Sequence, residues 1–181
     1  YEIAAGGAER QTSLRGYFLG GEAADLAVIE ADENGDRRIR VYGFGDGAWD
    51  LIVDATIGRE VVFVDTAKMN GGDHLLAYEP GRLHRFDPGS GSLRELAEVA
   101  TSFNVLDEDE VPHVDITLDA NRDGRDDVVI PDKDGFWTCI QLNDGTLSEC
   151  VKLGPPEPFL EEVPLDESRY YGELGITDVN D

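Results

Sequence analysis

One short segment of the sequence carries oxygen-bearing residues at alternating positions. Its positions 1, 3, 5, 7 and 9 are Asp119, Asn121, Asp123, Arg125 and Asp127. Four of these residues offer side-chain oxygens, and Arg125 at position 7 can offer its backbone carbonyl. Because calcium takes six to eight oxygen ligands at about 2.3 to 2.6 Å, a short loop that binds it must curl back on itself. The spacing therefore predicts a calcium-binding loop.

The residues within and after this segment indicate which kind of loop it is. Gly124 at position 6 permits a sharp turn. An EF-hand would place a bidentate Glu at position 12 and continue into a helix. Position 12 is instead Ile130, which ends a β-branched run that begins at Val128. We therefore expect a calcium loop between two β-strands, and an ion-free turn rich in Asp and Asn is the alternative.

The elements that must position this loop are short β-strands. Apolar residues recur with a period close to two at 25–30, 60–65 and 127–130, as they do in strands. Dipeptides that favour tight turns separate such runs, namely Asn34-Gly35, Asp46-Gly47, Pro80-Gly81, Pro88-Gly89, Asp134-Gly135 and Asp144-Gly145. The pattern predicts antiparallel hairpins and an all-β fold.

The strands and turns recur as an internal repeat. Three segments keep the same order of parts, an opening loop and four short strands, at intervals of roughly 50 residues, close to the length of a propeller blade. The expected units are 1–13 (an N-terminal strand and linker), 14–58, 59–105 and 106–154 (three blade-like repeats), and 155–181 (an acidic, proline-rich loop and the start of a fourth repeat).

Only the third repeat carries the whole loop signature. In the second repeat, Asp65 and Asp73 align with positions 1 and 9, but Ala67 and Met69 fill positions 3 and 5. The first repeat retains only Asp25 among the ligand positions. We expect no metal in these two loops.

A strand–loop–strand calcium motif inside a four-stranded repeat resembles the FG-GAP and VCBS repeats of integrin-α-type β-propellers and of many bacterial secreted proteins. The resemblance covers about 14–181, including a partial metal site at Asp178 and Asn180, which match positions 1 and 3. It implies a partial β-propeller of four-stranded antiparallel blades that needs more blades to close. It also implies that the calcium ion stiffens the loop at a blade edge.

The overall charge restricts the partners. Asp and Glu number 39 against 15 Lys and Arg, which gives a formal net charge of −24. Such a polyanion repels nucleic acid and anionic membranes and attracts multivalent cations. No apolar run reaches the 18 or so residues of a spanning helix, and no start methionine or signal sequence is present, so we expect a mature or trimmed chain without membrane insertion.

The two cysteines, Cys139 and Cys150, flank the turn at Asp144-Gly145. A two-residue turn there would place them directly opposite each other, at a hydrogen-bonded pair whose spacing is wide for a disulfide. A disulfide, a one-residue slip in the turn and two free thiols all remain open. A disulfide would agree with an oxidising compartment.

The remaining reactive side chains give weaker signals. His74, His84 and His113 have no spacing typical of a zinc pair, and we expect them to be structural or exposed. Trp49 and Trp137 are expected to pack between blades, with an aromatic platform for sugars as the alternative. The sequence contains no nucleophile elbow, phosphate-binding glycine loop or Cys–His arrangement, so we expect no catalytic activity.

These features predict a non-catalytic, calcium-stabilised module for binding, adhesion or structure. By resemblance it would be secreted, on the cell surface or in the periplasm, with a protein or glycan ligand. One alternative is a secreted polysaccharide-acting propeller enzyme whose active site lies in other blades. Another is a subunit that forms a homo-oligomeric fibre or ring through open sheet edges.

Overall fold

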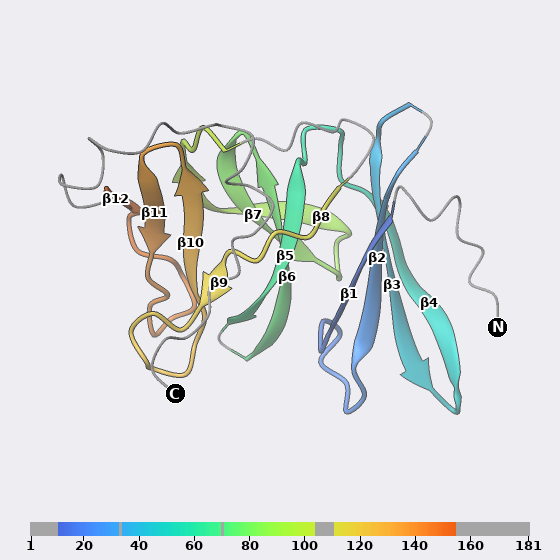
Figure 1. Cartoon of the computed structure of the whole chain (residues 1–181). Coiled ribbons are helices and arrows are strands. Elements are labelled where there is room, and N and C mark those ends of the chain that lie inside the picture. The colour runs from blue at the N-terminus through green and yellow to red at the C-terminus, as the bar shows by residue number, and fades with distance from the viewer. Residues whose placement is uncertain (1–10, 33, 70, 104–110, 155–181) are drawn as a thin grey trace.

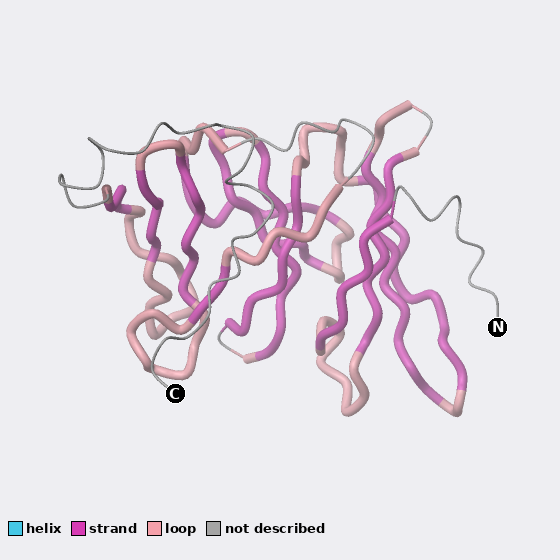
Figure 2. Tube along the Cα trace, in the orientation of Figure 1, coloured by secondary structure: helices cyan, strands magenta, loops and turns pink. Residues whose placement is uncertain are grey.

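The computed structural model describes residues 11–32, 34–69, 71–103 and 111–154. Within these ranges the chain forms three four-stranded antiparallel sheets and no helix (Figures 1 and 2). The all-β class is therefore confirmed for this part of the chain. Of the expected N-terminal strand and linker (1–13), residues 1–10 lie outside the described residues, and 11–13 belong to a strand of the first sheet. The start of a fourth repeat, including Asp178 and Asn180, also lies outside the described residues.

Each sheet is a meander, so that strands adjacent in sequence are neighbours in space. Sheet 1 contains β1 (Gln11–Gly16), β2 (Asp25–Ala31), β3 (Arg37–Gly45) and β4 (Ala48–Thr56). Sheet 2 contains β5 (Phe63–Met69), β6 (Gly72–Glu79), β7 (Gly81–Asp87) and β8 (Ser92–Val99). Sheet 3 contains β9 (Thr117–Leu118), β10 (Asp127–Asp132), β11 (Gly135–Cys139) and β12 (Val151–Leu153).

The hairpin turns lie at or beside the dipeptides that predicted them. Between β3 and β4, for example, Gly45 pairs with Ala48 across Asp46 and Gly47. Both turn residues have positive φ, 50° and 79°, as a two-residue type I′ turn requires. The predicted antiparallel hairpins are confirmed in all three sheets.

The three sheets lie side by side, and their facing surfaces form two cores (Figure 1). Sheet 2 lies in the middle and is buried on both faces. In β6, Leu75 and Ala77 belong to the core with sheet 1, while Leu76 and Tyr78 belong to the core with sheet 3. Because both faces of this strand are buried, its sequence reads as a continuous apolar run.

A segment before β9 ties the sheets together along their first strands. His113 forms a parallel bridge with Val64 of β5, supported by Val64 N–H to Pro112 O and Val114 N–H to Val64 O, both 3.0 Å. The Thr12 hydroxyl of β1 donates to the carbonyl of Val111 at the start of the same segment. The first strands β1, β5 and β9 therefore lie close together, and the loops that follow them reach the same end of the molecule (Figure 1).

Candidate metal centre

The predicted calcium loop lies between β9 and β10, and its oxygen side chains turn inward onto its own backbone. The carboxylate of Asp119 accepts the N–H groups of Asp123 and Gly124 at 2.9 and 2.8 Å. Asn121 Oδ1 accepts the Asp123 N–H at 2.9 Å, and Asp123 Oδ1 accepts the Arg125 N–H at 3.0 Å. These bonds bring the side chains at positions 1, 3 and 5 to the inside of one tight loop.

The sharp curvature of the loop depends on two left-handed residues. Gly124 has φ 83°, which costs a glycine little, and Arg122 has φ 62°, which is uncommon for a residue with a Cβ. Position 6 therefore has the conformation that the sequence predicted for it.

Asp127 at position 9 anchors the loop by accepting hydrogen bonds from backbone N–H groups. Its side chain is fully buried, and Oδ2 accepts the N–H groups of Ala120 and Asn121 at 3.1 and 3.3 Å. Oδ1 accepts the N–H of Gln141 at 2.8 Å, just beyond the end of β11. One carboxylate thus joins the start of the loop to the neighbouring strand.

The side chain of Arg125 makes an interaction that the ligand spacing did not reveal, because the spacing indicates only a role for its backbone carbonyl. The guanidinium forms an ion pair with Asp123 and donates to Asn143 Oδ1 at 2.8 Å. The hydrogen bond that Arg125 donates to the Asp123 carboxylate holds the pKa of Asp123 below its usual value. A positive charge therefore already lies beside position 5.

The donor set suits calcium, although the described side chains are not gathered into a metal cluster. Within 11–32, 34–69, 71–103 and 111–154, no group of three or more His, Cys, Asp or Glu side chains is arranged to hold a metal ion. The loop oxygens are instead engaged with backbone N–H groups. An ionised carboxylate has about four lone-pair sites, so Asp119 and Asp123 retain acceptor capacity beyond these bonds.

The first sheet repeats the anchor of the loop but not its ligands. Asp25 is buried, and its Oδ2 accepts the N–H of Leu19, six residues earlier, at 2.8 Å. Asp127 accepts the N–H of Asn121 over the same interval. Position 9 therefore has a structural role in sheet 1, where the other ligand positions are absent.

In the second sheet, the predicted alignment of Asp65 and Asp73 with positions 1 and 9 is wrong. Asp65 lies within β5, where its buried carboxylate accepts the Ile116 N–H at 2.8 Å. The β5–β6 hairpin is tight, because Met69 pairs with Gly72. This loop is shorter than the loops that follow β1 and β9, and Asp65 lies outside it.

The strand register and the contacts between sheets together show the correspondence. Asp25 pairs with Gly16, and Asp127 pairs with Leu118. Lys68 is the counterpart of Tyr17, because the N–H of each donates to an Asp of the next sheet. The residue before Lys68 pairs with His74, which places His74 at position 9 and Asp73 at position 8, where the third loop has Asp126.

The equivalence of Asp73 and Asp126 is visible in matching contacts between sheets. Asp73 Oδ2 accepts the N–H of Tyr17 from sheet 1 at 3.0 Å, and Asp126 accepts the N–H of Lys68 from sheet 2. Asp126 N–H also donates to Lys68 O at 3.1 Å. The candidate loop is thus bonded directly to the end of β5. Burial at this contact raises the pKa of Asp126.

A histidine lies against the misassigned carboxylate. His113 Nε2 is 2.8 Å from Asp65 Oδ1, with the imidazole about half exposed and the carboxylate buried. The hydrogen bond with Asp65 raises the pKa of His113, although partial burial opposes that shift. This pair joins the segment before β9 to sheet 2.

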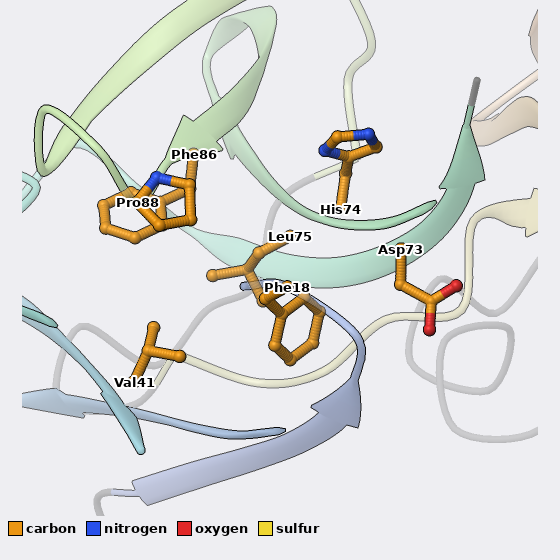
Figure 3. A pocket seen from close by; sticks show the side chains of 7 residues that line it. All are labelled: Phe18, Val41, Asp73, His74, Leu75, Phe86 and Pro88. Atoms are coloured by element: carbon orange, nitrogen blue, oxygen red, sulfur yellow. The ribbon is translucent and has the colours of Figure 1, made fainter. Parts of the chain in front are cut away.

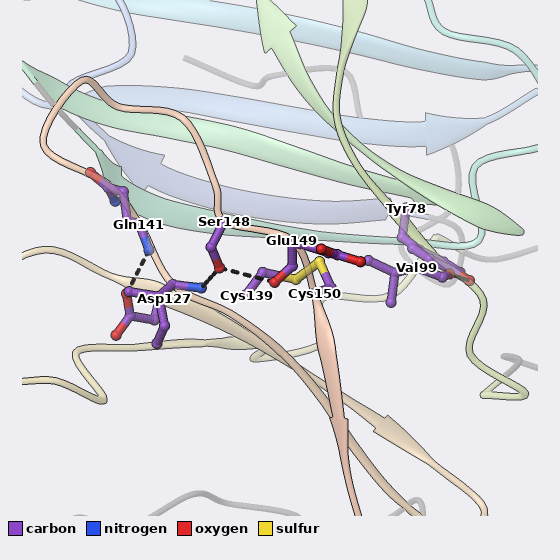
Figure 4. The surroundings of a disulfide bond; sticks show 9 residues. Tyr78, Val99, Asp127, Cys139, Gln141, Ser148, Glu149 and Cys150 are labelled. Carbon is purple, nitrogen blue, oxygen red and sulfur yellow. Dashed lines mark hydrogen bonds between the residues drawn. A yellow bond between two sulfur atoms is a disulfide. The ribbon is translucent and has the colours of Figure 1, made fainter.

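Cys139, the last residue of β11, and Cys150, the residue before β12, form a disulfide (Figure 4). Their Cα atoms are 4.3 Å apart, the spacing of a non-hydrogen-bonded pair rather than the wider pair that we predicted. The predicted two-residue turn is wrong, because Leu142 N–H donates to Thr146 O and Gln141 bridges Leu147. The one-residue slip left open by the sequence is confined to this turn, since Thr138 still pairs with Val151 and the two cysteines lie opposite each other as predicted.

The two tryptophans have different surroundings. Trp137 packs against the core between sheets 2 and 3 and donates Nε1–H to Asp132 at 3.0 Å, so its predicted packing between sheets is confirmed. Trp49 is 40% exposed beside Phe44 near the tip of the β3–β4 hairpin, on a face that no described sheet covers, so its packing between blades stays a prediction.

A small cavity lies between sheets 1 and 2, lined by Phe18, Val41, Asp73, His74, Leu75, Phe86 and Pro88 (Figure 3). Its volume of about 10 Å³ is comparable to one water molecule. The cavity is too small for an organic substrate.

No family model matches the chain, and no curated protein matches it. The described residues also contain no helix long and apolar enough to cross a membrane. The resemblance to FG-GAP and VCBS repeats therefore depends on the loop motif and the four-stranded units alone.

Proposed function

We propose that this chain is a non-catalytic, calcium-stabilised binding or structural module of the FG-GAP/VCBS type. The observation that carries the proposal is the loop at 119–127, in which oxygen side chains at positions 1, 3 and 5 converge over a buried anchor at position 9. Calcium would be held by Asp119, Asn121, Asp123 and Asp127, with the Arg125 carbonyl at position 7. The ion would neutralise charge on the three carboxylates at the ligand positions, Asp119, Asp123 and Asp127.

The same loop explains how the ion would stabilise the protein. Asp126, inside the loop, is bonded to Lys68 of sheet 2, and Gln141 Nε2 donates to the Asp126 and Lys68 carbonyls at 2.8 and 3.2 Å. An ion that orders the loop would therefore also favour the packing of sheet 3 on sheet 2. This supports a structural role for the metal rather than a catalytic one.

The arrangement of the sheets supports a β-propeller. Sheet 2 is covered on both faces by sheets of the same build, and the first strands of the three sheets lie together at one side. Radial repetition of such units, with the first strand innermost, is the architecture of a propeller. A complete propeller would need further blades beyond these three.

A secreted or surface location fits two properties of the chain. The Cys139–Cys150 disulfide is typical of oxidising compartments, and the net charge of −24 suits a calcium-rich exterior. The ligand would be a protein or glycan. Screening neutral and acidic glycans for both binding and cleavage would separate the binding module from a polysaccharide-acting enzyme.

The stabilising role of calcium can be tested by thermal unfolding in calcium, in magnesium and in chelator. We expect calcium to raise the melting temperature of the wild type more than magnesium does, because magnesium demands a tighter octahedral site. Asp123→Ala should remove the calcium-dependent increase. A wild-type melting temperature that is the same in calcium and in chelator would refute the proposal.

Asp144→Ala is the matched control for that experiment. Asp144 also accepts hydrogen bonds within an exposed turn, from the N–H and hydroxyl of Thr146, but it lies outside the loop. Its variant should keep the full calcium response. Equal loss of the response in both variants would indicate a general charge effect instead of a site.

A further inference from the structure

The two outer sheets each present one face that no described sheet covers. Sheet 2 buries both of its faces, whereas sheets 1 and 3 contribute only one face each to the two cores. Side chains alternate between the faces of a strand. The neighbours of the core residues therefore identify the two outward faces, which lie at opposite ends of the row (Figure 1).

The outward face of sheet 3 is apolar, and we call it the trailing face. Ile130 and Cys139 point into the core with sheet 2, so the residues beside them point outward. The trailing face consists of Val129, Pro131, Phe136, Thr138, Val151 and Leu153, which share rows of the strand register. Phe136, Val151 and Leu153 are 40%, 56% and 53% exposed, and none of the six residues is charged.

The outward face of sheet 1, the leading face, has an apolar half near the β3–β4 turn. Val41 points into the core with sheet 2, and the residues after it alternate outward. The apolar half consists of two register pairs, Tyr42 with Leu51 and Phe44 with Trp49. The rings of Phe44 and Trp49 are 5.1 Å apart, which confirms that they share a face.

The other half of the leading face is charged but internally neutralised. Arg38 pairs with Asp54, and Arg40 pairs with Glu30 at 2.6 Å. These two pairs neutralise each other, and Arg15, in the register row of Leu26 and Tyr42, adds one positive charge to the face. Neither outward face therefore carries the negative charge that dominates the rest of the chain.

We infer that a second copy of the chain covers these faces, with its leading face packed on the trailing face of the first. The contact joins two different faces, so it is heterologous and generates a ring or a fibre according to whether the rotation closes. The association is face to face and differs from pairing between open sheet edges. It does not depend on calcium being bound at the loop.

The contacts inside the chain indicate what such faces bind. Both described interfaces join one sheet of this build to another. Val129 is the third residue of β10, as Ala27 is the third residue of β2. Phe136 and Ile39 also correspond, because each pairs with the fifth residue of that strand in its own sheet. Ala27 and Ile39 form the buried surface that sheet 1 offers to sheet 2. The trailing face thus uses the positions that make an interface elsewhere in the same molecule.

The solution mass of the whole 181-residue chain tests this inference. We expect light scattering after gel filtration to show a mass that rises with concentration. The mass should rise further with salt, because screening weakens the repulsion between polyanions. A trailing-face variant, Phe136→Asp with Leu153→Asp, and a leading-face variant, Phe44→Asp with Trp49→Asp, should each be monomeric.

Mixing the two variants gives the decisive result. Each retains the face that the other has lost, so an equimolar mixture should form a two-chain complex that cannot grow further. Ile52→Asp is the control, since this 57% exposed residue lies beside Gly43, on the face opposite Phe44. It should leave the wild-type mass unchanged. Circular dichroism verifies that the variants are folded.

A wild-type chain that stays monomeric at every concentration and salt would overturn the inference, and it would favour coverage of these faces by further sheets of a longer chain. Variants that associate as the wild type does, or fail to complement each other when mixed, would also overturn it. Loss of association upon changing only sheet-edge residues would assign it to edge pairing instead.

Discussion

Replacing Asp127 by Ala should destabilise the protein even when no calcium is present. Two backbone N–H groups, those of Asn121 and Gln141, lose their acceptor, whereas the Ala120 N–H still donates to the Leu118 carbonyl at 3.0 Å. The Gln141 group is buried, and leaving such a donor unsatisfied costs about 1 to 3 kcal/mol. Asn121 is exposed, so water can replace part of its bond, at a net cost of about 0.5 to 1.5 kcal/mol. The expected loss is about 1.5 to 4.5 kcal/mol of unfolding free energy.

The assay is urea unfolding in chelator, followed by far-ultraviolet circular dichroism. Chelator separates the structural role of Asp127 from its proposed role as a ligand. Asp127→Asn retains one oxygen, so it can serve Gln141 or the loop but not both, and its loss should lie between those of wild type and Asp127→Ala. Asp144→Ala, in an exposed turn, is the control. A loss below about 0.5 kcal/mol for Asp127→Ala, within the usual range of surface substitutions, would refute this account of the anchor.

Three further predictions concern the cores and their connections. Tyr78 is buried and stacked on an aromatic neighbour at 4.8 Å, so Tyr78→Ala should lower the unfolding free energy by about 3 to 5 kcal/mol in urea titrations; a loss under about 1 kcal/mol would contradict its place in the core. The hydrogen bond with Asp65 raises the pKa of His113, so the stability it adds should be complete below the unfolded pKa near 6.5 and disappear as pH rises through the higher folded pKa. His113→Gln should therefore cost more stability at about pH 5.5 than at about pH 8, and a cost independent of pH would contradict the pair. Replacing Cys139 and Cys150 together by Ser should cost about 2 to 3 kcal/mol for a loop of this length, and an unchanged thermal transition would show that the disulfide adds no stability.

Local signals made most of the fold predictable. Strand alternation and turn dipeptides act over a few residues, so the hairpins follow from sequence alone. The register of β11 with β12 was also predictable, since Thr138 pairs with Val151 as the cysteine spacing indicated. The turn between them was not, because its hydrogen bonds involve Leu142 and Thr146 rather than the Asp-Gly dipeptide alone.

The second repeat was misaligned because two different constraints use the same residue type. Asp65 accepts an N–H from Ile116, 51 residues away, which no local pattern can reveal. Asp73 serves a contact between sheets, whereas Asp25 and Asp127 anchor their own loops. Spacing alone could not separate these roles, and a shortened hairpin concealed the one-residue shift.

In the candidate site, the sequence predicted the loop and the role of Asp127, but not the Arg125 guanidinium that lies beside the ligand positions. The guanidinium of Arg125 reaches both Asp123 and Asn143, and Asn143 comes from a different turn. Calcium would have to compete with this ion pair for Asp123. The affinity of the loop therefore depends on a tertiary contact that spacing does not encode.

Calorimetric titration of calcium into the metal-free chain tests the central claim most directly. The account predicts saturable binding that is abolished by replacing Asp119 and Asp123 together by Ala and retained in Asp144→Ala. Absence of saturable binding in the wild type, or binding that survives in the double variant, would contradict the assignment of the 119–127 loop as a calcium site.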